Sequence, residues 1–131
     1  TEQMLEEMVE HLIASGKEVF GKTLRVFNAS DGLYGRQYPI PGVGRIDLLA
    51  EDVSTGDLVV IELKRDETDD QVIGQISRYV SWVREHLAPK GKNVNGVICV
   101  KQATRKLMLA VRNIAGVEVY EYDLSFRSVA R

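Results

Sequence analysis

Residues 44–64 read GRIDLLAEDVSTGDLVVIELK, and this stretch decides the fold. Two apolar runs, 46–50 and 58–63, flank Ser54-Thr55-Gly56-Asp57, whose residue types favour a tight turn. The sequence therefore predicts a β-hairpin. Because both runs are almost continuously apolar rather than alternating, we expect the two strands to be covered on both faces.

Three charged residues interrupt these apolar strands: Asp47 in the first, and Glu62 and Lys64 in the second. Charged side chains are rarely buried without a partner, so their presence here requires an explanation. Glu62 and Lys64 are two residues apart and share one face of the strand. Pairing Val53 with Leu58 across a four-residue turn puts Asp47 opposite Lys64, about 5 Å away, with Glu62 on the diagonal at about 7–8 Å.

Two carboxylates and one ammonium group on one patch suit a divalent cation and a phosphate ester. Carboxylate oxygens are typical ligands of Mg²⁺ and Mn²⁺. Lys64 cannot bind a hard cation, but it can hold a water nucleophile and stabilise negative charge. The alternative is a salt bridge between Glu62 and Lys64 at the edge of the sheet, with Asp47 in solvent. We favour the catalytic interpretation because Gly-x-x-Asp precedes Glu-x-Lys at the distance of one hairpin.

The flanking sequence predicts helices and further strands on either side of the hairpin. Apolar residues at helical spacing predict helices over residues 2–15, 68–87 and 104–113, with Thr1 as an N-cap and Thr68-Asp69-Asp70-Gln71 as a capping box. Strands are predicted at 23–27, 94–100 and 117–122, whereas prolines and glycines disfavour regular structure through most of residues 28–44. This order predicts an α/β fold with a central mixed sheet flanked by helices.

Composition limits the class of protein. The 131 residues fit a single domain, and a net charge of −2 excludes a globally basic nucleic-acid binder while permitting one positive groove. The one cysteine, Cys99, excludes an intramolecular disulfide and favours a reducing, cytoplasmic setting. No apolar run is long enough to span a membrane, so we expect no membrane partner. Because the chain starts with Thr rather than Met, we expect residues 1–131 to be one domain excised from a longer protein.

Taken together, the segments 44–47 (Gly-Arg-Ile-Asp) and 61–65 (Ile-Glu-Leu-Lys-Arg) resemble the PD-(D/E)-x-K nuclease superfamily. They are most similar to the nuclease domain of NucS-type endonucleases, which act on mismatched and branched DNA. The resemblance implies a restriction-endonuclease-like α-β-β-β-α-β core and a Mg²⁺- or Mn²⁺-dependent enzyme of DNA repair that leaves a 5′-phosphate. It also implies that Asp47, Glu62 and the backbone carbonyl of Leu63 bind the metal, while Lys64 positions the nucleophilic water.

The same resemblance assigns roles to residues on two helices. Gln75 and Tyr79 match a Gln-x-x-x-Tyr pattern that borders the active site, with Gln75 among the catalytic residues; core packing is the alternative for Tyr79. Glu6 matches an acidic position of the first helix and would be an outer-shell metal partner, with Glu7 and Glu10 as competitors. Four arginines could bind DNA phosphates, with a surface ion pair as an equal alternative for each: Arg36, Arg45, Arg65 and Arg78.

We therefore expect a divalent-metal-dependent endodeoxyribonuclease whose partner is DNA, acting as a homodimer or with an additional domain in the full-length protein. Two alternatives remain open. One is a non-catalytic DNA-binding or assembly module with a nuclease fold, and the other is a restriction- or resolvase-like nuclease with another substrate. The intact Asp47, Glu62 and Lys64 favour an enzyme, since a binding module has no need to bury these charges together.

Overall fold

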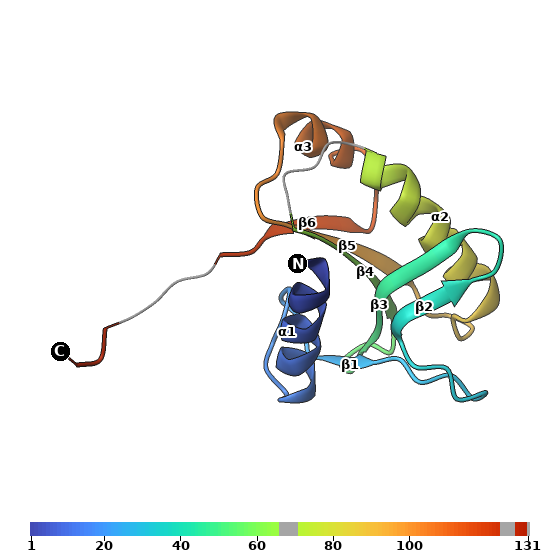
Figure 1. Ribbon diagram of the computed structural model, residues 1–131. Helices are drawn as coiled ribbons and strands as arrows, with labels where there is room; N and C mark the ends of the chain where they lie inside the picture. Colours follow the sequence, from blue (N-terminus) through green and yellow to red (C-terminus); the bar gives the residue numbers. More distant parts are fainter. Residues whose placement is uncertain (66–70, 124–127, 131) are drawn as a thin grey trace.

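The computed structural model of the protein describes residues 1–65, 71–123 and 128–130. Its elements follow in the order α1 (Glu2–Ala14), β1 (Leu24–Val26), β2 (Arg36–Ile40), β3 (Gly44–Asp52), β4 (Leu58–Lys64), α2 (Gln71–His86), β5 (Val94–Val100), α3 (Arg105–Val111) and β6 (Val117–Glu121). The strands form one sheet (Figure 1).

The sheet is mixed, as the sequence predicts. Along one edge of β3, its C-terminal residues pair with β1 and its N-terminal residues pair with β2, both antiparallel. Along the other edge β3 pairs antiparallel with β4, which continues in parallel to β5 and then to β6. The predicted α/β architecture with a central mixed sheet is therefore confirmed.

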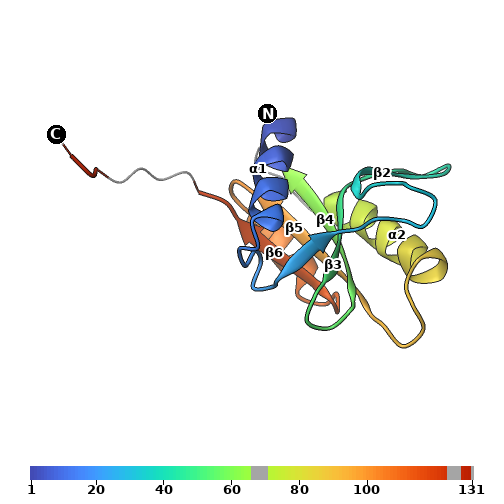
Figure 2. The ribbon, with the colours of Figure 1, turned by 90° about the horizontal axis from the view of Figure 1, so that it is seen from below.

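Helices cover both faces of the sheet, α1 on one side and α2 with α3 on the other (Figures 1 and 2). Successive residues of the central strands divide between two hydrophobic cores. Leu48, Ile61 and Leu63 belong to the core beneath α1, whereas Leu49 and Val60 belong to the core beneath α2. All five side chains are fully buried, which confirms that β3 and β4 are covered on both faces.

β2 corrects the expectation that residues 28–44 are largely irregular. It runs from Arg36 to Ile40 and pairs with β3, although it contains Pro39. Proline lacks the N–H that a ladder requires and is tolerated where a strand has only one neighbour. β2 meets that condition because it pairs with β3 alone among the described strands. Part of the Gly- and Pro-rich stretch 28–44 therefore forms an edge strand rather than an irregular loop.

The register of the hairpin also differs from the prediction. Leu48 lies opposite Ile61 and Glu51 opposite Leu58, so the strands are shifted by two residues relative to a Val53–Leu58 pairing. The turn is closed by a hydrogen bond from the Asp52 N–H to the Asp57 carbonyl, one residue earlier than expected. Extending this register by one residue places Glu62, and not Lys64, opposite Asp47.

The remaining elements agree with the predicted order. The Thr1 hydroxyl caps α1 by accepting a hydrogen bond from the Met4 N–H, while the predicted capping box at residues 68–71 begins outside the described residues.

The apolar stripe of α1 is narrower than expected, since Met4 and Met8 are exposed and Glu6 is buried on the inner face. No helix in the described part of the chain has the length and apolar character needed to cross a membrane.

Candidate active site

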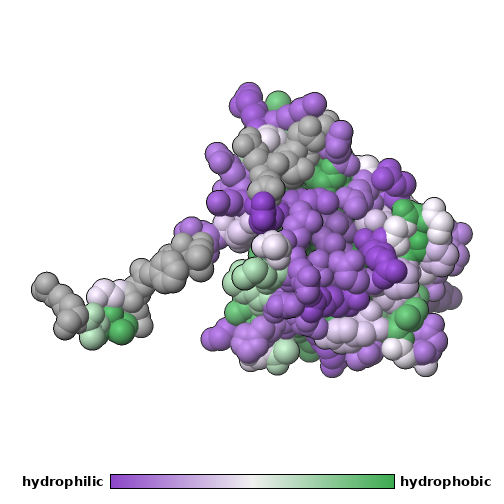
Figure 3. Space-filling model, in the orientation of Figure 1, coloured by the Kyte–Doolittle hydropathy of each residue, from purple (hydrophilic) through white to green (hydrophobic). Residues whose placement is uncertain are grey.

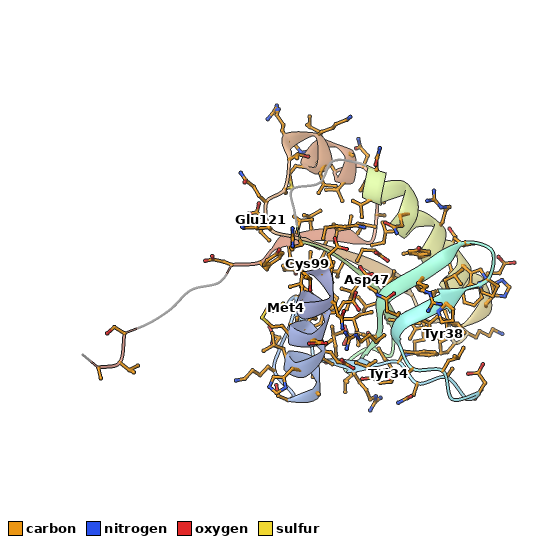
Figure 4. All side chains as sticks on the ribbon, viewed as in Figure 1. Met4, Tyr34, Tyr38, Asp47, Cys99 and Glu121 are labelled. Carbon is orange, nitrogen blue, oxygen red and sulfur yellow. The ribbon has the colours of Figure 1, made fainter. Side chains whose placement is uncertain are left out.

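The site lies where β3 and β4 separate. Among the described residues, the ladder between these strands ends at the Leu48–Ile61 pair, and the preceding part of β3 pairs only along its other edge, with β2. The Asp47 carboxylate occupies the place of the missing strand partner, because its Oδ2 atom accepts the backbone N–H of Leu63 at 2.8 Å. Figure 4 shows Asp47 near the centre of the molecule, between α1 and the β2–β3 pair.

This contact also orients the backbone carbonyl of Leu63. In an extended strand the N–H and C=O groups of one residue point toward the same neighbouring strand. Since the Leu63 N–H is directed at Asp47, the Leu63 carbonyl points toward the same side of β4. Two oxygen-bearing groups, a carboxylate and a carbonyl, therefore flank the gap between β3 and β4.

Glu62 supplies a second carboxyl group in a buried position. The residue is 1% exposed, and its Oε1 atom has no hydrogen-bond partner in the described part of the chain. The pKa of the Glu62 carboxyl is raised to about 9, mainly by burial and also by the charge of the adjacent Asp47 and a hydrogen bond with it, while Lys64 opposes the rise. A buried carboxyl group with an unused oxygen atom beside a second carboxylate is the arrangement that a cation stabilises.

Lys64 opens onto a cleft on the α2 side of the sheet. This cleft has a volume of about 410 Å³, and its polar lining comes from Lys64, Gln71, Gln75, Arg78 and Tyr79. The Gln75 amide donates to the Tyr79 hydroxyl at 3.4 Å. The structure therefore brings Lys64 together with the two predicted helix residues. Tyr79 is itself 4% exposed, and its ring packs in the core, as the alternative interpretation of this residue expected.

Gly44 explains how Tyr79 reaches the cleft. A Cβ atom at this position would lie 2.4 Å from the Tyr79 hydroxyl oxygen, a separation that side chains do not tolerate. The glycine of the Gly-x-x-Asp stretch thus permits close contact between β3 and α2. The motif combines a metal-binding candidate, Asp47, with a packing requirement three residues earlier.

Glu6 reaches the site from the opposite side, through a residue that sequence reasoning missed. Glu6 is 5% exposed, and its Oε2 atom accepts a hydrogen bond from the Gln37 amide at 2.8 Å. The same amide nitrogen lies 3.4 Å from Asp47 Oδ1. Gln37 therefore connects Glu6 to Asp47. No pattern in the sequence indicated this role, because residues 28–44 were expected to lack regular structure.

The donor set around the gap consists of oxygen atoms. The described Asp, Glu, His and Cys side chains contain no group of three placed to hold a metal ion. Asp47, Glu62 and the Leu63 carbonyl nevertheless present the hard oxygen donors that Mg²⁺ and Mn²⁺ prefer. The unpartnered Glu62 Oε1 atom is the observation in favour of a bound cation.

The four arginines separate into two groups. Arg36 is paired with Glu6, Glu7 and Glu10 on α1, so its guanidinium has the ion-pair role that was the alternative to phosphate binding. Arg45, Arg65 and Arg78 are exposed, and Arg78 lies on the cleft beside Lys64. Much of the molecular face seen in Figure 3 is hydrophilic, including the area over α1, β2 and β3.

Comparisons with known proteins identify the family and the fold of the chain. The family model described as "Endonuclease NucS C-terminal domain" matches residues 6–125. A solved structure described as a repair endonuclease from Pyrococcus abyssi has a TM-score of 0.68 and 25% identity over 90% of this chain and 46% of its own. No curated protein sequence matches the chain significantly.

Two further structures share the fold. One is described as an EndoMS–dsDNA2 complex, with a TM-score of 0.66 and 23% identity over 92% of this chain and 45% of its own. The other is EndoMS in apo form, with a TM-score of 0.63 and 19% identity over 96% of this chain and 48% of its own. The chain spans slightly less than half the length of these structures. Because the family model covers nearly all of it, the chain belongs to the family of endonuclease NucS C-terminal domains.

Proposed function

We propose that this domain is the catalytic part of a divalent-metal-dependent DNA endonuclease of the PD-(D/E)-x-K type. The observation that carries the proposal is the Glu62 carboxyl group, buried beside Asp47 with an oxygen atom that has no partner among the described residues. Leaving such a group unpaired is unfavourable, so a site of this kind is expected to serve a ligand. Membership of the NucS C-terminal domain family supports DNA cleavage as the chemistry.

Asp47, Glu62 and the Leu63 carbonyl would hold Mg²⁺ or Mn²⁺. When bound, the ion polarises the phosphoryl group and acidifies a bound water molecule. The Leu63 N–H keeps Asp47 Oδ2 in place, and the buried Glu62 has little freedom to turn away. The protein thus presents its oxygen donors in a fixed geometry, which is what a preorganised site requires.

Lys64 acts on the substrate side of this group. Its ammonium group holds the nucleophilic water and offsets the negative charge that develops on the phosphate oxygens. Gln75 and Tyr79 border the same cleft and contact water or substrate, while the exposed Arg45, Arg65 and Arg78 are suited to DNA phosphates. Lys64 and the arginines supply local positive charge to a chain whose net charge is −2.

The substrate proposal rests on the relatives. One matching structure is described as a repair endonuclease and another as a complex with dsDNA, which supports duplex DNA as the partner and DNA repair as the setting. Mismatched or branched duplexes are the proposed targets. Since the chain spans under half of those structures, we propose that full activity requires a further domain or a homodimer. The cytoplasmic location stays a prediction.

A panel of labelled perfect, mismatched, flapped and junction duplexes, each with Mg²⁺ or Mn²⁺, tests this function. Wild type should cleave at least one of them, whereas Glu62→Gln and Lys64→Ala should not. Lys17→Ala is the matched control, because Lys17 is an exposed lysine outside the cleft and its loss should leave cleavage unchanged. If both site variants cut at the wild-type rate, the activity belongs to a contaminant and the chain is a binding module.

A further inference from the structure

Gln37 has an unusual backbone for a residue inside a strand. Its φ angle is +50°, and Phe20 is the one other residue besides glycines with a positive φ in the described part of the chain. Left-handed backbone is unfavourable for a side chain of this size, and such conformations persist where the surrounding structure enforces them. Residues held in this way are often found at functional sites, so the contacts of Gln37 are informative.

The strained position coincides with a gap in strand pairing. Along β2 and β3, Arg36 lies opposite Leu48 and Tyr38 opposite Ile46, but Gln37 and Asp47 between them do not pair in the ladder. Both residues instead use their side chains. The Gln37 amide reaches Asp47 Oδ1 at 3.4 Å, and the Leu63 N–H reaches Asp47 Oδ2 at 2.8 Å. Each oxygen of the Asp47 carboxylate is therefore directed by one donor.

Gln37 is in turn held by α1. Its amide donates to Glu6 Oε2 at 2.8 Å, and Glu6 Oε1 accepts from Arg36 Nε at 3.3 Å. Arg36 also binds Glu10 Oε1 at 3.2 Å. A continuous set of hydrogen bonds thus runs from α1 through Arg36, Glu6 and Gln37 to Asp47. Each carboxylate oxygen has two lone pairs, so Asp47 keeps acceptor capacity for a cation after receiving both donors.

We propose that Gln37 is a positioning residue, which orients Asp47 for the cation and through which Glu6 acts. This inference rests on the proposed metal-dependent function and extends it to the support of the metal ligand. Groups that orient a metal ligand without touching the ion commonly contribute about 10–100-fold to metal affinity. Glu6 has an indirect role because its hydrogen-bond connection to Asp47 passes through Gln37.

Mn²⁺ binding to the protein, measured by calorimetry without DNA, tests the inference. Gln37→Leu keeps the size of the side chain and removes the amide, and it should weaken Mn²⁺ binding about 10–100-fold. Gln3→Leu is the matched control, since the Gln3 amide donates to Glu7 rather than to Asp47, and it should bind Mn²⁺ as wild type does. If Gln37→Leu does not fold, Gln37→Asn replaces it, because Asn tolerates left-handed backbone but its amide is too short to reach both carboxylates.

The relation between Glu6 and Gln37 gives a second measurement. If Glu6 acts through Gln37, the double variant Glu6→Ala/Gln37→Leu should bind Mn²⁺ no more weakly than Gln37→Leu alone. Losses that multiply would show that Glu6 acts independently, and would overturn the inference. If wild type binds Mn²⁺, Asp47→Ala does not, and Gln37→Leu binds normally, Gln37 has no positioning role while the metal site stands. If wild type itself does not bind Mn²⁺, the proposed function fails first.

Discussion

Replacing Glu62 by Gln should stabilise the metal-free protein at neutral and alkaline pH, although it removes a residue of the site. Glu62 is 1% exposed, its Oε1 atom has no partner in the described structure, and Asp47 lies beside it. Ionising this carboxyl group in the folded state is therefore unfavourable. A glutamine side chain has nearly the same shape and carries no charge at any of these pH values, so it removes the penalty.

The pH dependence follows from the direction of the shift. The ordinary pKa of the Glu62 carboxyl is 4.5, and burial beside Asp47 raises it to about 9 in the folded state. A raised folded-state pKa means that the folded protein binds the Glu62 proton more tightly than the unfolded chain does. The stability gained from this tighter proton binding is complete below pH 4.5 and is lost as the pH rises toward 9. One pH unit within this window changes the free energy of unfolding by about 1.4 kcal/mol. From pH 5 to pH 8, wild type should lose on the order of 4 kcal/mol.

Urea unfolding in EDTA at pH 5, 6.5 and 8 measures this loss. At pH 8 Glu62→Gln should be more stable than wild type by on the order of 2–4 kcal/mol, and the difference should nearly vanish at pH 5. Glu118→Gln is the control of opposite sign. The hydrogen bond and ion pair with Lys22 lower the pKa of the Glu118 carboxyl, so removing this carboxylate should slightly destabilise the protein. Equal unfolding curves for wild type and Glu62→Gln at pH 8 would refute the reasoning.

Four further outcomes are expected. Mn²⁺ should raise the melting temperature of wild type but not of Asp47→Ala, and equal shifts in both would place the cation elsewhere. Lys64→Ala should bind Mn²⁺ normally yet cleave a labelled duplex at least about 100-fold more slowly, which single-turnover kinetics would show. The isolated domain should nick supercoiled plasmid before linearising it; concerted double-strand breaks on an agarose gel would instead indicate a dimer of this domain. Gly44→Ala should lower the free energy of unfolding by about 1–3 kcal/mol, because the new methyl group collides with the Tyr79 hydroxyl, and Tyr79→Phe should relieve part of that loss.

The elements that the sequence predicts well are those whose own residues carry a strong pattern. The continuous apolar runs of β4 and β5 and the helical spacing in α1 and α2 each reflect burial of that segment. β2 lacks such a pattern. In the sequence, Pro39 indicates the end of a strand. The structure accommodates this proline inside β2 because β2 pairs only with β3 among the described strands.

The residues of the candidate site could be named from the sequence, but their geometry could not be predicted. Asp47, Glu62 and Lys64 stand out as charges in apolar strands, which is a local signal. The register depends on which residues close the turn. The sequence alone does not distinguish closure by the Asp52–Asp57 hydrogen bond from the expected Val53–Leu58 pairing. Gln37 had no signal of its own, because its role arises from a left-handed φ angle and from contacts with residues 10 and 31 positions away.

During synthesis, β4 leaves the ribosome well before the strand that completes its pairing. Residues Leu58–Leu63 are buried, but β5 lies beyond α2, so the second edge of β4 stays unpaired until Val100 has emerged. At about 5–20 residues per second this interval lasts a few seconds. An apolar strand with an open edge can pair with another nascent chain in that time. Chains truncated before Val94 should therefore aggregate, and chaperone demand during translation should be greatest while residues 65–100 are emerging from the ribosome.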